Sequence, residues 1–162
     1  CLCLINLLQD EDSMHMFATP VTDKIAHNYH DIIKCPMDLQ TILEKASNDL
    51  YHDYAWLRES FELMVYNALT FNSPFTKFWN EARRYYSVCL KNIFESQGKA
   101  APPSKYSKMI EACFLKAQNN LQAEKERLRK DMTAEKKDLV AGVKVSSVKL
   151  EKLTKPNDPK SC

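Results

Sequence analysis

The chain has 162 residues, about the length of one domain with a tail. Its only glycines are Gly98 and Gly142, which excludes the glycine-rich loops that bind nucleotide phosphates. The formal net charge of +2 conceals an asymmetry. Residues 1–97 carry eight basic and thirteen acidic residues, a balance of −5, whereas residues 98–162 carry fifteen and eight, a balance of +7. The acidic head, residues 1–97, suits a basic partner, and the basic tail, residues 98–162, suits phosphate or an acidic protein. The alternative is that each is an ordinary solvated surface.

The six cysteines show no paired metal-ligand spacing, so we predict no metal site and a reduced, intracellular compartment. No cofactor is expected. The sequence has no signal peptide and no apolar run of about 18 residues, so no segment is predicted to span a membrane. The first residue is not Met, which suggests a fragment of a larger protein.

Apolar residues between Leu2 and Leu8 predict a short first helix. Residues 13–37 have no sustained period and predict a long structured loop, and loops of this length in compact domains are usually functional. Asp38 is well placed as the N-cap of a second helix. That helix would carry the apolar residues Leu39, Ile42, Leu43 and Ala46.

Asp53 is placed to cap a third helix. Its apolar residues are spaced by 4, 3, 4 and 3 positions, which is typical of an amphipathic helix with one buried face: Leu57, Phe61, Met64, Ala68 and Phe71. Asn72-Ser73-Pro74 ends that helix, and a similar rhythm follows in Phe78, Ala82, Tyr85, Cys89 and Ile93. The fold class is therefore predicted to be all-α, a four-helix bundle with a long loop between its first two helices and a mouth at one end.

Residues 98–103 predict a linker, and a charged helical extension follows over residues 104–139. Its first half carries an apolar stripe that should dock on a surface, and its second half is charged and suited to water. Phe114, Leu121 and Leu128 are seven residues apart, but Glu135 occupies the next position, so coiled-coil pairing competes with a docked or solvated helix. Residues 140–162 predict a flexible tail.

Two segments carry a family resemblance. One is the loop with Tyr29 and Pro36-Met37-Asp38, and the other is the helix end at Asn72. With these motifs at matching spacings, residues 2–97 resemble the bromodomain, a four-helix module that reads acetyl-lysine, and we take residues 1–97 as the domain. The rest of the chain shows no such resemblance.

The resemblance implies five acetyl-lysine-binding residues. Asn72 would meet the acetyl oxygen and Tyr29 would hold a water. Phe17 would be the last member of a Trp-Pro-Phe shelf, Val21 would line the wall, and Phe78 would be the gatekeeper at the start of the last helix.

Departures from the family pattern concern the rim. His15 and Met16 replace the Trp and Pro of the shelf, which implies a softer and more adaptable edge. Phe71 stands where the family often has Tyr, which makes the slot more apolar, and Trp79 follows the gatekeeper. These four residues are the candidate rim.

Each site residue has an ordinary alternative. An Asn at a helix end before Ser-Pro is commonly a turn residue. Tyr29 would otherwise be a packed loop aromatic, and Phe17, Val21 and Phe78 would otherwise be core. The four histidines lie near no nucleophile motif and form no His-Glu-x-x-His, so we predict that the chain is not an enzyme.

The leading hypothesis is a nuclear reader of acetylated histone tails. A second is a degenerate bromodomain that acts as a scaffold and self-associates, or binds a partner helix, through residues 104–139. A third is nucleic-acid contact by the basic tail, which lacks base-stacking aromatics beyond Tyr106 and Phe114. Because both Tyr29 and Asn72 are retained, the first hypothesis is preferred.

Overall fold

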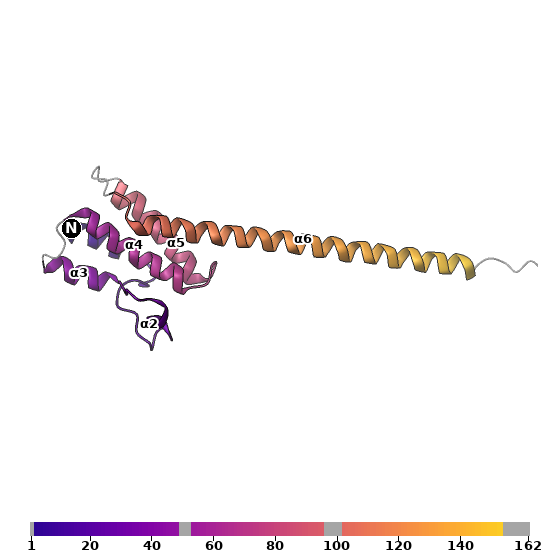
Figure 1. The fold of residues 1–162 in the computed structure, drawn as a ribbon, viewed down its shortest axis with the longest axis horizontal. Helices are drawn as coiled ribbons and strands as arrows, with labels where there is room; N and C mark the ends of the chain where they lie inside the picture. Colours follow the sequence, from indigo (N-terminus) through magenta and orange to yellow (C-terminus); the bar gives the residue numbers. More distant parts are fainter. Residues whose placement is uncertain (1, 49–52, 96–101, 154–162) are drawn as a thin grey trace, which may run out of the picture. The chain divides into compact units, whose positions relative to one another are not determined.

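The computed structural model describes residues 2–48, 53–95 and 102–153, and these ranges contain helices and no strands. The all-α prediction is confirmed (Figure 1). The helices are α1 (Leu2–Glu11), α2 (Tyr29–Ile32), α3 (Leu39–Ser47), α4 (Tyr54–Phe71), α5 (Lys77–Cys89), the π-helix η1 (Leu90–Glu95) and α6 (Lys105–Leu153). The chain divides into two compact units, Cys1–Ala117 and Gln118–Cys162. Over the described ranges, no helix combines the length and the apolar character needed to cross a bilayer.

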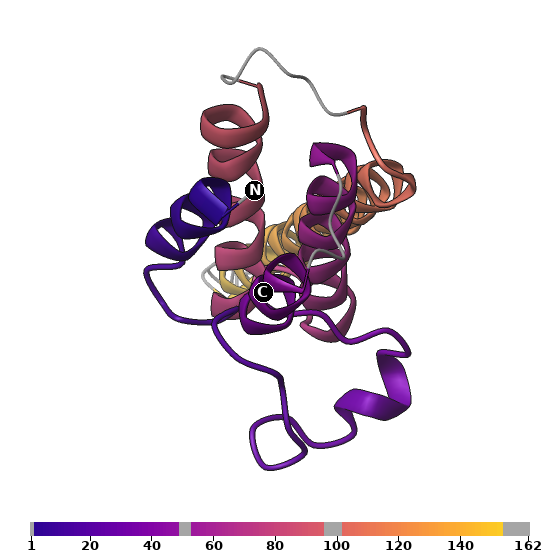
Figure 2. The ribbon, with the colours of Figure 1, turned by 90° about the vertical axis from the view of Figure 1, so that its left-hand side faces the viewer.

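The first unit contains the predicted four-helix bundle, formed by α1, α3, α4 and α5 with η1. Helix α4 packs on α5, and α1 packs on both α3 and α5 (Figure 2). At the centre lies Phe61, fully buried, with its ring 5.6 Å from that of Tyr85 and 5.2 Å from that of Phe94. The period read from the sequence thus identified four buried residues of α4, Leu57, Phe61, Met64 and Ala68, whereas Phe71 is only partly buried. The helix also buries residues outside that stripe, such as Glu62, Val65 and Asn67, so the prediction of a single buried face is incomplete.

Both predicted N-caps are present. The Asp38 side chain accepts a hydrogen bond from the N–H of Thr41 at 2.9 Å, and Asp53 accepts one from the N–H of Trp56 at 2.9 Å. An N-cap acceptor satisfies one of the amide donors that a helix leaves unpaired at its start, which fixes where α3 and α4 begin.

The long loop between α1 and α3 differs from the prediction in one respect, because it contains the single helical turn α2. Asn28, directly before α2, has a left-handed backbone with φ of 60°. Asn tolerates this conformation better than most residues. A four-residue helix is too short to produce a periodic signal, and this is why the sequence did not predict it.

The start of α6 packs on the bundle of its own chain. Ile110 is fully buried and Ala117 nearly so. The ring of Phe114 lies 5.8 Å from that of Trp79 and 6.1 Å from that of Tyr86, both in α5. The stripe predicted to need a docking surface therefore finds it within the first unit.

A buried carboxylate reinforces this packing. Glu62 in α4 is completely buried and accepts a hydrogen bond from Arg58 Nε at 2.9 Å and from the Ser104 backbone N–H at 3.2 Å. Ser104 Oγ also donates to it, and Ser107 Oγ lies 2.8 and 2.7 Å from its two oxygens. A buried carboxylate needs several donors to offset its lost hydration. Three of these four donor groups belong to Ser104, directly before α6, and to Ser107 in its first turn, which ties this helix to α4.

Helix α6 also extends further than the sequence predicted. The predicted end was Leu139, and residues from 140 onward were expected to be flexible, whereas the helix continues to Leu153. The segment has no proline between Pro103 and Pro156, so every residue of the extension can donate its helical hydrogen bond, although Gly142 and the four valines of residues 140–153 are weaker helix formers. Residues 154–162 of the predicted tail lie outside the described residues.

We predict that Ser107→Ala lowers the free energy of unfolding by about 1 to 3 kcal/mol, because the buried Glu62 carboxylate loses a donor. Urea denaturation measures the change. Ser47→Ala is the matched control, since the Ser47 hydroxyl bonds only to the Leu43 carbonyl of its own exposed helix surface. Equal losses in the two variants would contradict a stabilising role for the Glu62 network.

Candidate functional site

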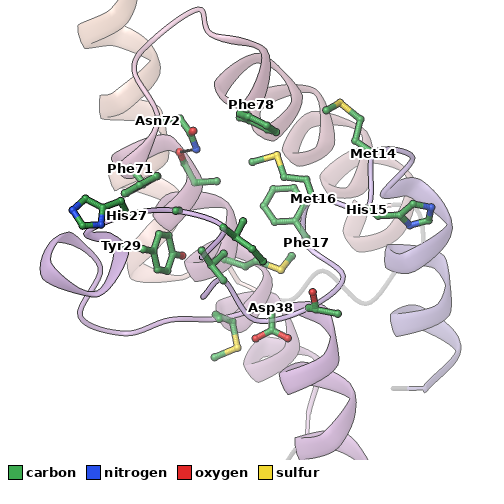
Figure 3. Close-up of a pocket in the computed structure, with 17 residues that line it drawn as sticks. Met14, His15, Met16, Phe17, His27, Tyr29, Asp38, Phe71, Asn72 and Phe78 are labelled. Carbon is green, nitrogen blue, oxygen red and sulfur yellow. Dashed lines mark hydrogen bonds between the residues drawn. The ribbon is translucent and has the colours of Figure 1, made fainter. Parts of the chain in front are cut away.

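A cavity of about 500 Å³ opens at the end of the bundle where the long loop meets the turn between α4 and α5 (Figure 3). Its walls come from that loop, the C-terminal half of α4 and the first turn of α5. The lining residues are Met14, His15, Met16, Phe17, Thr19, Val21, Ile25, Ala26, His27, Tyr29, Met37, Asp38, Met64, Ala68, Phe71, Asn72 and Phe78.

All five residues expected to bind acetyl-lysine line this one cavity: Asn72, Tyr29, Val21, Phe17 and Phe78. In Figure 3, Asn72 and Tyr29 lie along one side of the pocket, with Met16, Phe17 and Phe78 along the other. The structure thus brings together residues that are up to 61 positions apart in the sequence.

Asn72 is the C-cap of α4. Its backbone is extended, and its N–H donates to the Ala68 carbonyl at 3.1 Å. The side-chain Nδ2 donates to the same carbonyl at 2.9 Å, which fixes the orientation of the carboxamide. A carboxamide nitrogen carries two hydrogens, so one remains for a ligand in the cavity.

Tyr29 begins α2 and is almost completely buried. Its ring meets that of Phe71 edge-on, with centroids 5.1 Å apart. Burial, and secondarily the negative charge of Asp38, raise the pKa of the Tyr29 phenol above its ordinary value. The hydroxyl therefore stays protonated at neutral pH and is available as a hydrogen-bond donor.

Asp38 lines the cavity, but its carboxylate serves as the N-cap of α3. Its two carboxylate oxygens accept from the Thr41 N–H at 2.9 Å and the Thr41 hydroxyl at 2.6 Å. The Asn72 carboxamide and the Tyr29 phenol are polar groups that the cavity offers to a ligand among mostly apolar side chains, and the lining also includes the polar side chains of Thr19, His15 and His27. No group of three His, Cys, Asp or Glu side chains in the described ranges is arranged to hold a metal ion.

Phe17 is fixed from several directions. Its ring stacks on that of Tyr85 with centroids 4.7 Å apart, and its carbonyl accepts from the Leu39 N–H at 2.8 Å. Its own N–H donates to Asp12 Oδ2 at 2.9 Å, while the Met16 N–H donates to Asp12 Oδ1 at 3.0 Å. Both oxygens of one buried carboxylate therefore hold the edge of the cavity.

Sequence reasoning missed Asp12, although a signal existed. An acidic residue just beyond a helix C-terminus opposes the helix dipole, so its presence there points to another role. Asn67 was also missed as an anchor. It is buried in α4 and donates from Nδ2 to the Cys35 carbonyl at 2.8 Å. A polar residue beside the apolar face of a helix needs a partner, and here the partner is the loop just before Pro36.

Three of the four candidate rim residues lie at the cavity: His15, Met16 and Phe71. His15 is exposed, and Figure 3 shows its ring on the α1 side, away from Asn72. The placement of Trp79 at the rim is wrong. Trp79 is 2% exposed and packs in the core against Phe114, whereas its neighbour Phe78 is 51% exposed. Successive helical residues differ in direction by about 100°, so only one of this pair can face the mouth.

Comparison with known proteins agrees with this geometry. The bromodomain family model matches residues 1–84, just over half of the chain. Bromodomain-containing protein 7 of Gallus gallus is 42% identical over 94 residues, which are 58% of this chain and 14% of that protein. Bromodomain-containing protein 9 of Xenopus laevis is also 42% identical over 94 residues, covering 58% and 17%. The chain spans less than a fifth of the length of these curated relatives.

Solved structures give the same relationship. The Trypanosoma cruzi bromodomain BDF2 aligns with a TM-score of 0.54 and 30% identity, over 56% of this chain and 80% of that one. A Leishmania donovani bromodomain, solved in complex with bromosporine, aligns with a TM-score of 0.56 and 26% identity, over 65% and 86%. This chain belongs to the bromodomain family, a family of acetyl-lysine reader modules.

Proposed function

We propose that the chain binds acetylated lysine in the cavity between the long loop and the α4–α5 turn. The observation that supports this proposal is the chemistry of the cavity, in which one oriented carboxamide, Asn72, stands among apolar walls. Acetyl-lysine is a neutral amide on an apolar four-carbon stem. A narrow apolar cavity can bury that stem if it also provides a donor to the amide oxygen.

Unmodified lysine is disfavoured twice at such a site. Its ammonium group would have to lose its hydration among largely apolar walls, and the Asp38 carboxylate that lines the cavity already accepts hydrogen bonds from Thr41 at both oxygens. Its three N–H donors would also face the donating side of Asn72 and the protonated phenol of Tyr29. Selection between the two forms of lysine therefore rests on charge and on hydrogen-bond polarity.

Tyr29 has a second role in this proposal. Its buried phenol lies across the same wall as Asn72 and can donate to a water that in turn bonds the acetyl oxygen. Phe17, Val21 and Phe78 provide apolar surface for the stem, while Met16 gives the rim an adaptable thioether in place of a rigid ring.

Histone tails are the acetylated partners that fit best, and the proposed location is the nucleus. The head carries a balance of −5, which attracts a basic polypeptide and raises its rate of encounter. The relatives are named bromodomain-containing proteins, and the Leishmania donovani neighbour is complexed with bromosporine, which makes this compound a suitable competitor in binding assays.

We predict that Asn72→Ala folds but binds an acetylated histone tail peptide about 5- to 150-fold more weakly. The acetyl oxygen would be buried without its donor, at a cost of about 1 to 3 kcal/mol. Isothermal titration calorimetry measures the affinity. Asn119→Ala is the matched control, because Asn119 is exposed and is not one of the residues that line the cavity.

An unmodified peptide of the same sequence should show no binding to either protein. Equal affinity of the original chain and Asn72→Ala for the acetylated peptide would contradict the proposal. A peptide array in which acetylated and unmodified histone tails bind equally would contradict it independently, since it would mean that the charge of the tail alone is recognised.

For the gatekeeper, we predict that Phe78→Ala changes ligand preference more than stability. Because Phe78 is half exposed, its truncation should cost less than about 1 kcal/mol, whereas Phe61→Ala in the core should cost about 3 to 5 kcal/mol. Thermal melts compare the two variants, and competition by bromosporine compares ligand fit. Similar large losses in both melts would mean that Phe78 is a core residue.

A further inference from the structure

The second unit carries a narrow apolar stripe that no residue of the chain covers over its described part. Every side chain described from Gln118 to Ala141 is exposed. Among them are Leu121 at 39%, Leu128 at 51%, Met132 at 70% and Leu139 at 74%. These four will be called the α6 stripe. Large apolar side chains exposed at this level usually mark an interaction surface when they are contiguous.

The α6 stripe is contiguous because of its spacing. The intervals along the chain are 7, 4 and 7 residues, which at about 100° per residue place all four side chains within about 40° of one another around the helix. This is the narrow seam of a two-stranded coiled coil, not the broad face of a helix docked on a domain. The seam consists of two rows of side chains, each with a spacing of seven residues. Glu135 takes the place after Leu121 and Leu128 in one row, and Met132 and Leu139 belong to the other row.

Two charged residues lie in the same seam, Lys125 and Glu135. Each falls within about 40° of the centre of the stripe, on opposite sides. All six seam positions are symmetric about Lys130. Leu128 and Met132 lie two residues from it, Lys125 and Glu135 lie five, and Leu121 and Leu139 lie nine.

We propose that the α6 stripe is a self-association surface on which two copies of this chain pair as antiparallel helices centred on Lys130. In this register Leu121 meets Leu139 of the other copy, and Leu128 meets Met132. Lys125 of each copy meets Glu135 of the other, so both seam charges are paired. Apolar contact and the pairing of both seam charges are satisfied together by one symmetric arrangement.

A parallel pair is the alternative arrangement of two copies. It would place Lys125 against Lys125 and Glu135 against Glu135 within the seam. Its advantage lies in the flanking positions, where Glu124 would face Arg129 and Asp131 would face Lys136 of the other copy. Flanking charges are solvent-exposed and contribute little, whereas unmatched charges in the seam lose hydration without compensation. Glu124 is moreover already paired with Arg127 of its own helix at 2.8 Å. The seam charges therefore decide the orientation.

The test is the sedimentation equilibrium of the full 162-residue chain, compared with variants of the seam. The original chain should show a concentration-dependent dimer. Lys125→Glu puts two carboxylates opposite each other in the antiparallel register, and should raise the dimer dissociation constant at least about tenfold, because unpaired interface charges are costly. Glu135→Lys should do the same. The double variant Lys125→Glu, Glu135→Lys restores opposite charges and should restore the dimer.

Lys130→Glu is the control for a change of charge, because Lys130 lies about 180° from the stripe, and it should leave the dissociation constant within a factor of about three. Circular dichroism verifies that each variant keeps its helix content, and an acetylated-peptide titration separates this surface from the proposed reader site. A strictly monomeric original chain would overturn the proposal, and would assign the stripe to a different partner. Failure of the double variant to recover the dimer would overturn the antiparallel register.

Discussion

The cavity depends on the backbone hydrogen bonds that keep the long loop between α1 and α3 in place. An irregular segment cannot pair its own amide and carbonyl groups as a helix does, and buried groups that stay unpaired are costly. Asp12 accepts the N–H groups of Met16 and Phe17 at one end of the loop, and Asn67 donates to the Cys35 carbonyl near the other. With both ends fixed, Phe17, Val21 and Tyr29 face a cavity and do not collapse onto one another.

Helices and their caps could be predicted from local patterns in the sequence, whereas hydrogen bonds between residues far apart in the chain could not. Helix positions and the caps Asp38 and Asp53 follow from a period and from residue type, so they were found in advance. Asn67 pairs with a residue 32 positions away and Glu62 with one 45 positions away, and neither separation leaves a trace in a local pattern. The site residues were identified through a family resemblance, which already encodes such long-range pairing.

The error at Trp79 has a simple geometric cause. Phe78 and Trp79 are adjacent at the start of α5, and adjacency in the sequence suggested a shared place at the mouth. On a helix, however, neighbouring side chains point in directions about 100° apart. Phe78 faces the cavity, and Trp79 consequently faces the core, where its ring lies 5.8 Å from that of Phe114 in α6.

Because Phe78 and Trp79 point in different directions, the first turn of α5 links the cavity to the start of α6, two parts of the molecule that are far apart in the sequence. The turn that presents Phe78 to a ligand is held on its other side by the docking of α6, through the contact of Trp79 with Phe114. One turn further along α5, the Arg83 guanidinium lies 5.7 Å from the centre of the same Phe114 ring. The Glu62 network fixes the start of the same α6 segment on α4. Helix α6 therefore supports the wall of the cavity without lining it, and residues 105–117 are a structural part of the domain although the family resemblance ends before them.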